Sequence, residues 1–175
     1  MADWSALYLR RDLATTPTVA ALGYGGFSLG MLTGRLSGDH LRRHLSPYIL
    51  IATGTILASA ALTATLVIPT PTAAIAGDTL VGVGLSLVAP LVFAAAGNQP
   101  DQPATDALAG VATLGYAGFL SGPPMIGLLA HTNGLRTGLA LVAALALAAA
   151  AAARHAQSLH TRQPPTPSDP AGPSI

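Results

Sequence analysis

Five long runs of this sequence hold at most one charged residue each, and they constrain the fold more than any other feature. An α-helix needs about 20 apolar residues to cross roughly 30 Å of hydrocarbon, and each run is close to that length. The runs lack the polar face that a surface helix of a soluble protein carries. They cover residues 17–34, 47–68, 72–97, 107–130 and 137–153. The sequence therefore predicts an all-α, polytopic membrane bundle with five full spans in hairpin order.

The composition supports a membrane protein and excludes several other classes. Hydrophobic residues make up 51% of the chain and charged residues 9%, whereas about a quarter of the residues in a soluble domain are charged. The formal net charge of +1 gives no basic field that would attract nucleic acid. Cysteine is absent, which excludes disulfides and thiolate metal sites. The lipid bilayer is the expected partner, and nucleic acid is not.

No pattern in the sequence indicates an enzyme. The five histidines fall in predicted loops or in the tail, without the spacing that places two ligands on one helix face. A nucleophile motif of the G-x-S-x-G type does not occur, and the glycine-rich segments lie inside predicted spans rather than after a strand. We therefore predict no catalytic residue, no metal and no cofactor.

Two segments nearly repeat each other: LGYGGFSLG at 22–30 and LGYAGFLSG at 114–122, with six of nine positions identical. They fall in the first and fourth predicted spans, so they run through the membrane in opposite directions. Inverted repeats of this kind are typical of secondary transporters. Chance similarity between two glycine-rich apolar helices is the alternative interpretation.

The two ends of the chain differ from the spans. Residues 1–16 are predicted to hold the end of a truncated helix and an outer loop, with Trp4 and Tyr8 on one helix face as an interfacial aromatic anchor. A short interfacial helix in its own right is the alternative. Residues 17–153 form the five-span bundle. Residues 154–175, with five prolines, are predicted to be a disordered cytoplasmic tail.

The arginines set the predicted orientation. Five of them fall on one side of the predicted bundle and three on the other, and a short loop concentrates Arg35, Arg42 and Arg43. Because positive charge in short loops stays on the cytoplasmic side, this loop and the tail are placed in the cytoplasm. The predicted location is the cell's inner, or cytoplasmic, membrane.

The segment Gly34-Arg35-Leu36-Ser37-Gly38-Asp39-His40-Leu41-Arg42-Arg43 resembles the cytoplasmic loop between the eighth and ninth helices of the major facilitator superfamily (MFS). Residues 2–9 resemble the outer end of the seventh helix in a bacterial inner-membrane branch. The pattern Gly115-Tyr116-x-Gly118-Phe119-x-x-Gly122-Pro123-Pro124 is similar to the eleventh helix. The resemblance covers residues 2–153. Leu41 departs from it, because the family places glycine before the basic pair.

The resemblance implies the carboxy-terminal half of an MFS transporter, with 3+3 inverted repeats, five full spans and the end of a sixth. Such a half belongs to a secondary active transporter that moves a small solute by alternating access. It needs a missing amino-terminal half or a second copy as its partner. A non-transporting membrane scaffold, a partner subunit and an inactive fragment are the rival interpretations.

The predicted loop also has a physical interpretation as a gate. Gly30, Gly34 and Gly38 are spaced four apart, so they stack on one face and let another helix approach closely. The nearby charges have two possible roles. They form contacts to a neighbouring helix in one conformation and release them in another, which is a gate, or they only set the membrane topology. The predicted gating loop comprises Gly34, Arg35, Gly38, Asp39, Arg42 and Arg43.

A substrate pathway is predicted from the first, third and fourth spans, because the second and fifth look like lipid-facing helices. Asp78 is the ionisable residue inside a span, which makes it either a proton-coupling or substrate-contacting carboxylate or a shallow, hydrated interfacial acid. The aromatic residues of the repeat offer hydroxyls to a solute or pack between helices. The predicted pathway residues are Tyr24, Phe27, Asp78, Tyr116 and Phe119.

Overall fold

The computed structural model describes residues 2–99 and 102–160, and every regular element within these ranges is a helix. This confirms the predicted all-α class. The helices are α1 (Ala2–Arg11), α2 (Pro17–His44), α3 (Pro47–Val67), α4 (Pro71–Leu85), α5 (Val88–Gly97), α6 (Ala104–Asn133) and α7 (Leu135–His160).

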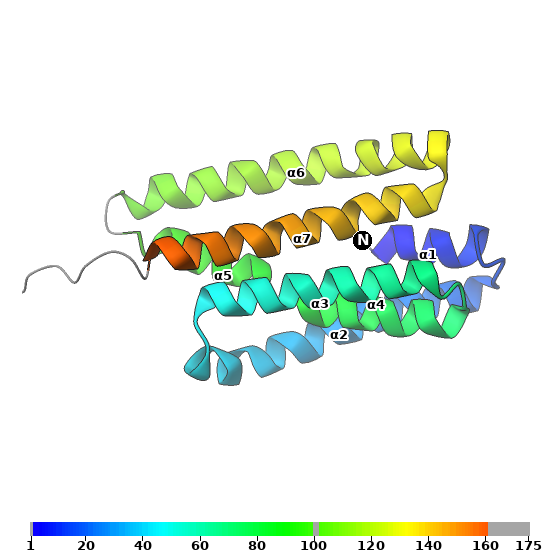
Figure 1. Cartoon of the computed structure of the whole chain (residues 1–175), viewed down its shortest axis with the longest axis horizontal. Helices are drawn as coiled ribbons and strands as arrows, with labels where there is room; N and C mark the ends of the chain where they lie inside the picture. The colour runs from blue at the N-terminus through cyan, green and yellow to red at the C-terminus, as the bar shows by residue number, and fades with distance from the viewer. Residues whose placement is uncertain (1, 100–101, 161–175) are drawn as a thin grey trace, which may run out of the picture.

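The helices run back and forth along the long axis of the molecule (Figure 1). Helix α2 lies along one edge of the bundle and α6 along the opposite edge, with α3, α4 and α7 between them (Figure 1). Helices α2 and α6, which carry the two repeat segments, run in opposite directions (Figure 1). The end of α2, the start of α3, the end of α5 and the end of α7 gather at one end of the bundle, which we call the arginine end because Arg42 and Arg43 lie in the last turn of α2.

Three helices begin with the same pair of residues, a hydroxyl side chain followed by proline. The hydroxyl oxygen accepts a hydrogen bond from a backbone N–H of the first turn, and proline adds no unsatisfied N–H there. The pairs are Thr16-Pro17 before α2, Ser46-Pro47 before α3 and Thr70-Pro71 before α4. These local signals explain why the sequence locates the helix starts well.

Among the described helices, three are long and apolar enough to cross a membrane: Pro47–Val67, Pro71–Gly97 and Leu135–Ser158. The second combines α4 and α5. Helix α2 has 28 residues and α6 has 30, but glycine, serine, threonine and tyrosine dilute their apolar content. The prediction of five spans rests on the length of uncharged segments, so it does not distinguish these weakly apolar residues from leucine. The predicted number of five spans is not confirmed.

Three local expectations were wrong. The segment 34–43 is not a loop, because α2 continues to His44 and turns only at Leu45 and Ser46, before Pro47. Residues 154–160 are not disordered, because α7 continues to His160; the remainder of the predicted tail lies outside the described residues. Tyr8 is not an interfacial anchor, since it is 1% exposed and its hydroxyl donates to the carbonyl oxygen of Thr65 at 3.5 Å.

Helix α4 packs between α2 and α3, and glycine permits the close approach on both sides. A Cβ atom on Gly30 of α2 would collide with the backbone of Thr79, and one on Gly82 of α4 would collide with the backbone of Phe27. On the other side, Gly54 of α3 and Gly84 of α4 face each other in the same way. The backbones approach this closely because each contact includes at least one glycine, which has no side chain to keep the helices apart.

Candidate functional site

The first part of the candidate site lies at a break in the candidate span Pro71–Gly97. Helix α4 ends at Leu85 and α5 begins at Val88. Proline at position 90 has no N–H for the carbonyl of Ser86, which removes one helical hydrogen bond. The hydroxyl of Ser86 donates to the carbonyl oxygen of Val83 at 2.7 Å, and the backbone N–H of Ser86 donates to the same oxygen at 3.3 Å. Pro90 is the sequence signal for this break, because a proline inside a predicted span interrupts the helical hydrogen bonds.

The last turns of α2 pack directly against the break. A Cβ atom on Gly34 would collide with the side chain of Ser86, and one on Gly38 would lie 2.5 Å from a methyl group of Leu87. Gly30, Gly34 and Gly38 are all buried. The prediction that these glycines share one face against another helix is therefore confirmed.

A cavity of about 300 Å³ lies beside the break. It brings together four of the residues predicted for the gating loop, and adds two residues of the broken span. Its lining is Arg35, Gly38, Asp39, Arg42, Leu87 and Pro90. Arg43 is exposed and is not among these residues. The predicted cluster thus exists as a helical surface around a cavity, although its role as a gate remains a prediction.

Asp78 occupies a second part of the site, inside the bundle. The residue is 3% exposed, and its Oδ2 atom accepts a hydrogen bond from the hydroxyl of Ser5 on α1. A Cβ atom on Gly23 of α2 would lie 3.1 Å from the same oxygen. The carboxyl group is therefore enclosed by α1, α2 and α4, and the interpretation as a hydrated interfacial acid is wrong. Sequence reasoning missed Ser5, because nothing in the short segment before α2 indicated a partner.

The aromatic residues of the two repeats are not brought together. Helices α2 and α6 make no contact in the described part of the chain. Tyr24 is 52% exposed, and Phe27 is half-buried against the core. Tyr116 and Phe119 are exposed on α6.

The α6 pair instead lines a cavity of its own. This cavity of about 530 Å³ is lined by Phe93, Ala112, Gly115, Tyr116 and Phe119. It lies between α5 and α6 and is largely aromatic. The structure therefore shows two separate aromatic surfaces rather than a single enclosed site.

Metal-ligating side chains do not gather anywhere in the described residues: no group of three or more histidine or acidic side chains is placed to hold an ion. The arrangement offers a buried carboxyl group, a charged cavity at a helix break and an aromatic cavity.

Known proteins resemble most of this chain. It is 40% identical over 154 residues to a protein of Yersinia pestis described as an uncharacterized MFS-type transporter, with 88% of this chain and 40% of that protein aligned. It is 39% identical over 145 residues to the membrane protein MosC of Rhizobium meliloti, covering 83% of this chain and 36% of MosC. An uncharacterized transporter of Sinorhizobium fredii is 36% identical over 134 residues, which are 77% of this chain and 36% of that protein. No family model and no solved structure matches.

These relatives confirm the resemblance to MFS transporters. The chain spans about two fifths of the length of the curated relatives that it matches. A membrane location follows from the same relatives and from the three apolar helices.

Proposed function

We propose that this chain forms part of a secondary active transporter, which moves a small solute across the cytoplasmic membrane by alternating access. The observation that carries the proposal is the extent of the similarity to transporters, which covers 77–88% of the chain rather than one motif. In this proposal α2 and α6 also cross the membrane, giving five spans, and the arginine end faces the cytoplasm. A missing amino-terminal half or a second copy completes the pathway.

The broken span supports a specific way of switching. Helix α4 is held between α2 and α3 by the glycine contacts, whereas α5 beyond the break contacts α6 and α3. Bending at Ser86 and Leu87 would move α5 and α6 relative to α2. It would also change the shape of the cavity that Arg35, Asp39 and Arg42 line. Discontinuous helices that line a cavity are a recurring feature of transporters.

We propose that Asp78 carries the coupled proton, and the proposal includes no cofactor. Placing a charge in a membrane costs about 3 kcal/mol on insertion scales, so a buried acid in a span usually has a function. Ser5 donates to the carboxyl group, so a change in protonation at Asp78 would alter the contact between α1 and α4. Coupling would then arise because the two states differ in this contact.

Alternating access is testable without knowing the solute, because the chain contains no cysteine. We would introduce Tyr116→Cys in the aromatic cavity and, as a matched control, Leu147→Cys on the predicted lipid-facing helix α7, where Leu147 is 52% exposed. A membrane-impermeant maleimide would be added to right-side-out and inside-out vesicles. We expect the cysteine at 116 to react from both sides and the one at 147 from neither, because only a thiol in water ionises and reacts.

A scaffold would give reaction at position 116 from one side at most, and that result would refute alternating access. Proton coupling is tested in the same vesicles by imposing a pH gradient. The gradient should change the ratio of inside to outside labelling at position 116, and Asp78→Asn should abolish this response. Asp106→Asn, at an exposed acid in the first turn of α6 that lines neither cavity, is the control that should retain the response, and loss of the response in Asp106→Asn alone would contradict the assignment.

A further inference from the structure

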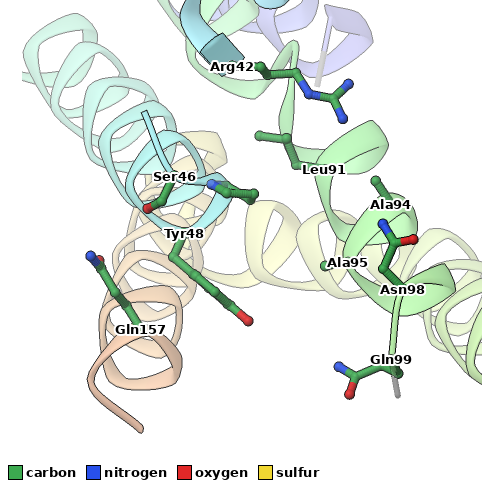
Figure 2. A pocket seen from close by; sticks show the side chains of 10 residues that line it. Arg42, Ser46, Tyr48, Leu91, Ala94, Ala95, Asn98, Gln99 and Gln157 are labelled. Carbon is green, nitrogen blue, oxygen red and sulfur yellow. The ribbon is translucent and has the colours of Figure 1, made fainter. Parts of the chain in front are cut away.

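A larger cavity lies at the arginine end and shares Arg42 with the smaller cavity at the helix break (Figure 2). Its volume is about 650 Å³, which falls within the range of small-molecule sites. It is enclosed by the end of α2, the first turn of α3, α5 with the two residues after it, and the end of α7. The lining residues are Arg42, Ser46, Pro47, Tyr48, Leu91, Ala94, Ala95, Asn98, Gln99 and Gln157.

The cavity is amphipathic. Among the described residues that line it, the polar groups are one guanidinium, two hydroxyls and three side-chain amides, with no carboxylate. Its apolar part is formed on α5 by Leu91, Ala94 and Ala95, of which Leu91 is 1% exposed. In Figure 2, Arg42 lies at the top of the view, Tyr48 and Gln157 lie at the left, and Asn98 and Gln99 lie at the lower right.

The position of the cavity matches the boundary between hydrocarbon and water. The candidate span Pro71–Gly97 ends at Gly97, and the polar residues Asn98 and Gln99 follow at once. The candidate span Pro47–Val67 begins beside Ser46 at the same end. A lipid headgroup sits at this depth, with its acyl chains beside the apolar turns of the helices.

We infer that this cavity binds an anionic phospholipid, with the headgroup phosphate on Arg42 and an acyl chain along Leu91, Ala94 and Ala95. Charge complementarity favours an anion, because the lining residues that the structure describes supply a cation and hydrogen-bond donors but no acid. The apolar part favours a lipid over a free anion, since inorganic phosphate would leave that surface uncovered. Arg42 also lines the smaller cavity, which contains Asp39. A bound phosphate would therefore compete with the Asp39 carboxylate for the guanidinium of Arg42.

The test compares two neighbouring arginines in the purified full chain. Native mass spectrometry would follow the binding of phosphatidylglycerol and, separately, phosphatidylcholine during titration in detergent. Arg42→Gln removes the proposed phosphate ligand. Arg43→Gln removes the same charge from an exposed position outside the cavity. We expect Arg42→Gln to weaken phosphatidylglycerol binding about tenfold more than Arg43→Gln does, as the loss of one charge-assisted hydrogen bond implies.

A second variant tests the acyl-chain part without changing charge. Ala94→Leu would fill the cavity and should weaken phosphatidylglycerol binding, whereas Ala151→Leu on the exposed face of α7 should not. Equal losses in Arg42→Gln and Arg43→Gln would overturn the inference, because they would show diffuse attraction to the bundle end. Displacement of phosphatidylglycerol by an equal concentration of inorganic phosphate would also overturn it, in favour of a soluble anion. The readout is lipid retention, so it is independent of transport.

Discussion

Replacing Gly30 by alanine should separate α2 from α4. The added Cβ would lie 2.9 Å from the carbonyl carbon and closer still to the carbonyl oxygen of Thr79, and 3.1 Å from the backbone nitrogen of Val83. These are backbone atoms, so no side-chain rotation relieves the overlap. Overpacking of this kind costs about 1–3 kcal/mol. Alanine also favours the helix over glycine by about 1 kcal/mol, which would hide part of the loss.

Gly25→Ala is the matched control, because a Cβ on Gly25 of the same helix meets no atom within 4 Å. Both variants gain the same helix propensity, so the difference between them isolates the overlap. We expect Gly30→Ala to be less stable than Gly25→Ala by about 1–3 kcal/mol, roughly a 5- to 150-fold difference in the folding equilibrium. The assay is unfolding of the purified chain by sodium dodecyl sulfate, followed by circular dichroism and by the fluorescence of Trp4. Equal midpoints for the two variants would refute the proposed backbone contact.

Two further predictions use the same assay and share the control Ser28→Ala, whose hydroxyl is exposed and bonds only within its own helix. Ser5→Ala should destabilise the chain by about 1–3 kcal/mol, because it removes the hydroxyl donor to the buried carboxyl group of Asp78. Stability equal to that of Ser28→Ala would show that this contact contributes nothing. Ser59→Ala should cost about 0.6 kcal/mol, because Ser59 donates to the carbonyl oxygen of Ala143 at 2.9 Å and joins α3 to α7. A loss above about 2 kcal/mol there would mean that the variant disturbs packing rather than one hydrogen bond.

The sequence predicted the features that depend on neighbouring residues or on composition. The spans predicted to begin at residues 17, 47 and 72 begin in the structure at Pro17, Pro47 and Pro71, and the spacing of Gly30, Gly34 and Gly38 defines a contact face. Both are local, so they can be read from a short segment. The charges at 35–43 predict a loop, and this prediction underestimates the length of α2, which continues to His44. Charged residues are compatible with a helix that emerges from the bundle into water.

The features that the sequence did not predict depend on contacts between distant segments. Ser5 and Asp78 are 73 positions apart, and neither neighbourhood indicates the other. The exposure of Tyr24 and Tyr116 is a similar case. The repeat predicted that they matter to one cavity, but their surroundings depend on which helices lie beside α2 and α6. The periodicity of a sequence shows which face of a helix packs against a neighbour, but it does not show which helix that neighbour is.

The position of the break relative to the glycine contacts narrows where a conformational change can occur. Gly54 and Gly84 join α3 to α4 through backbone atoms, just before the break at Ser86. Sliding at such a contact is costly, because close-packed helices have few alternative arrangements. Within the break, Leu87 meets Gly38 through the flexible end of its side chain rather than through backbone, and a side chain can adjust to a moving neighbour. Movement of α5 against a fixed α2–α3–α4 unit is therefore less costly than movement of α4. The cavity with Arg35, Asp39 and Arg42 lies at the boundary between the two parts, so it is where such a movement would first change the distances between charges.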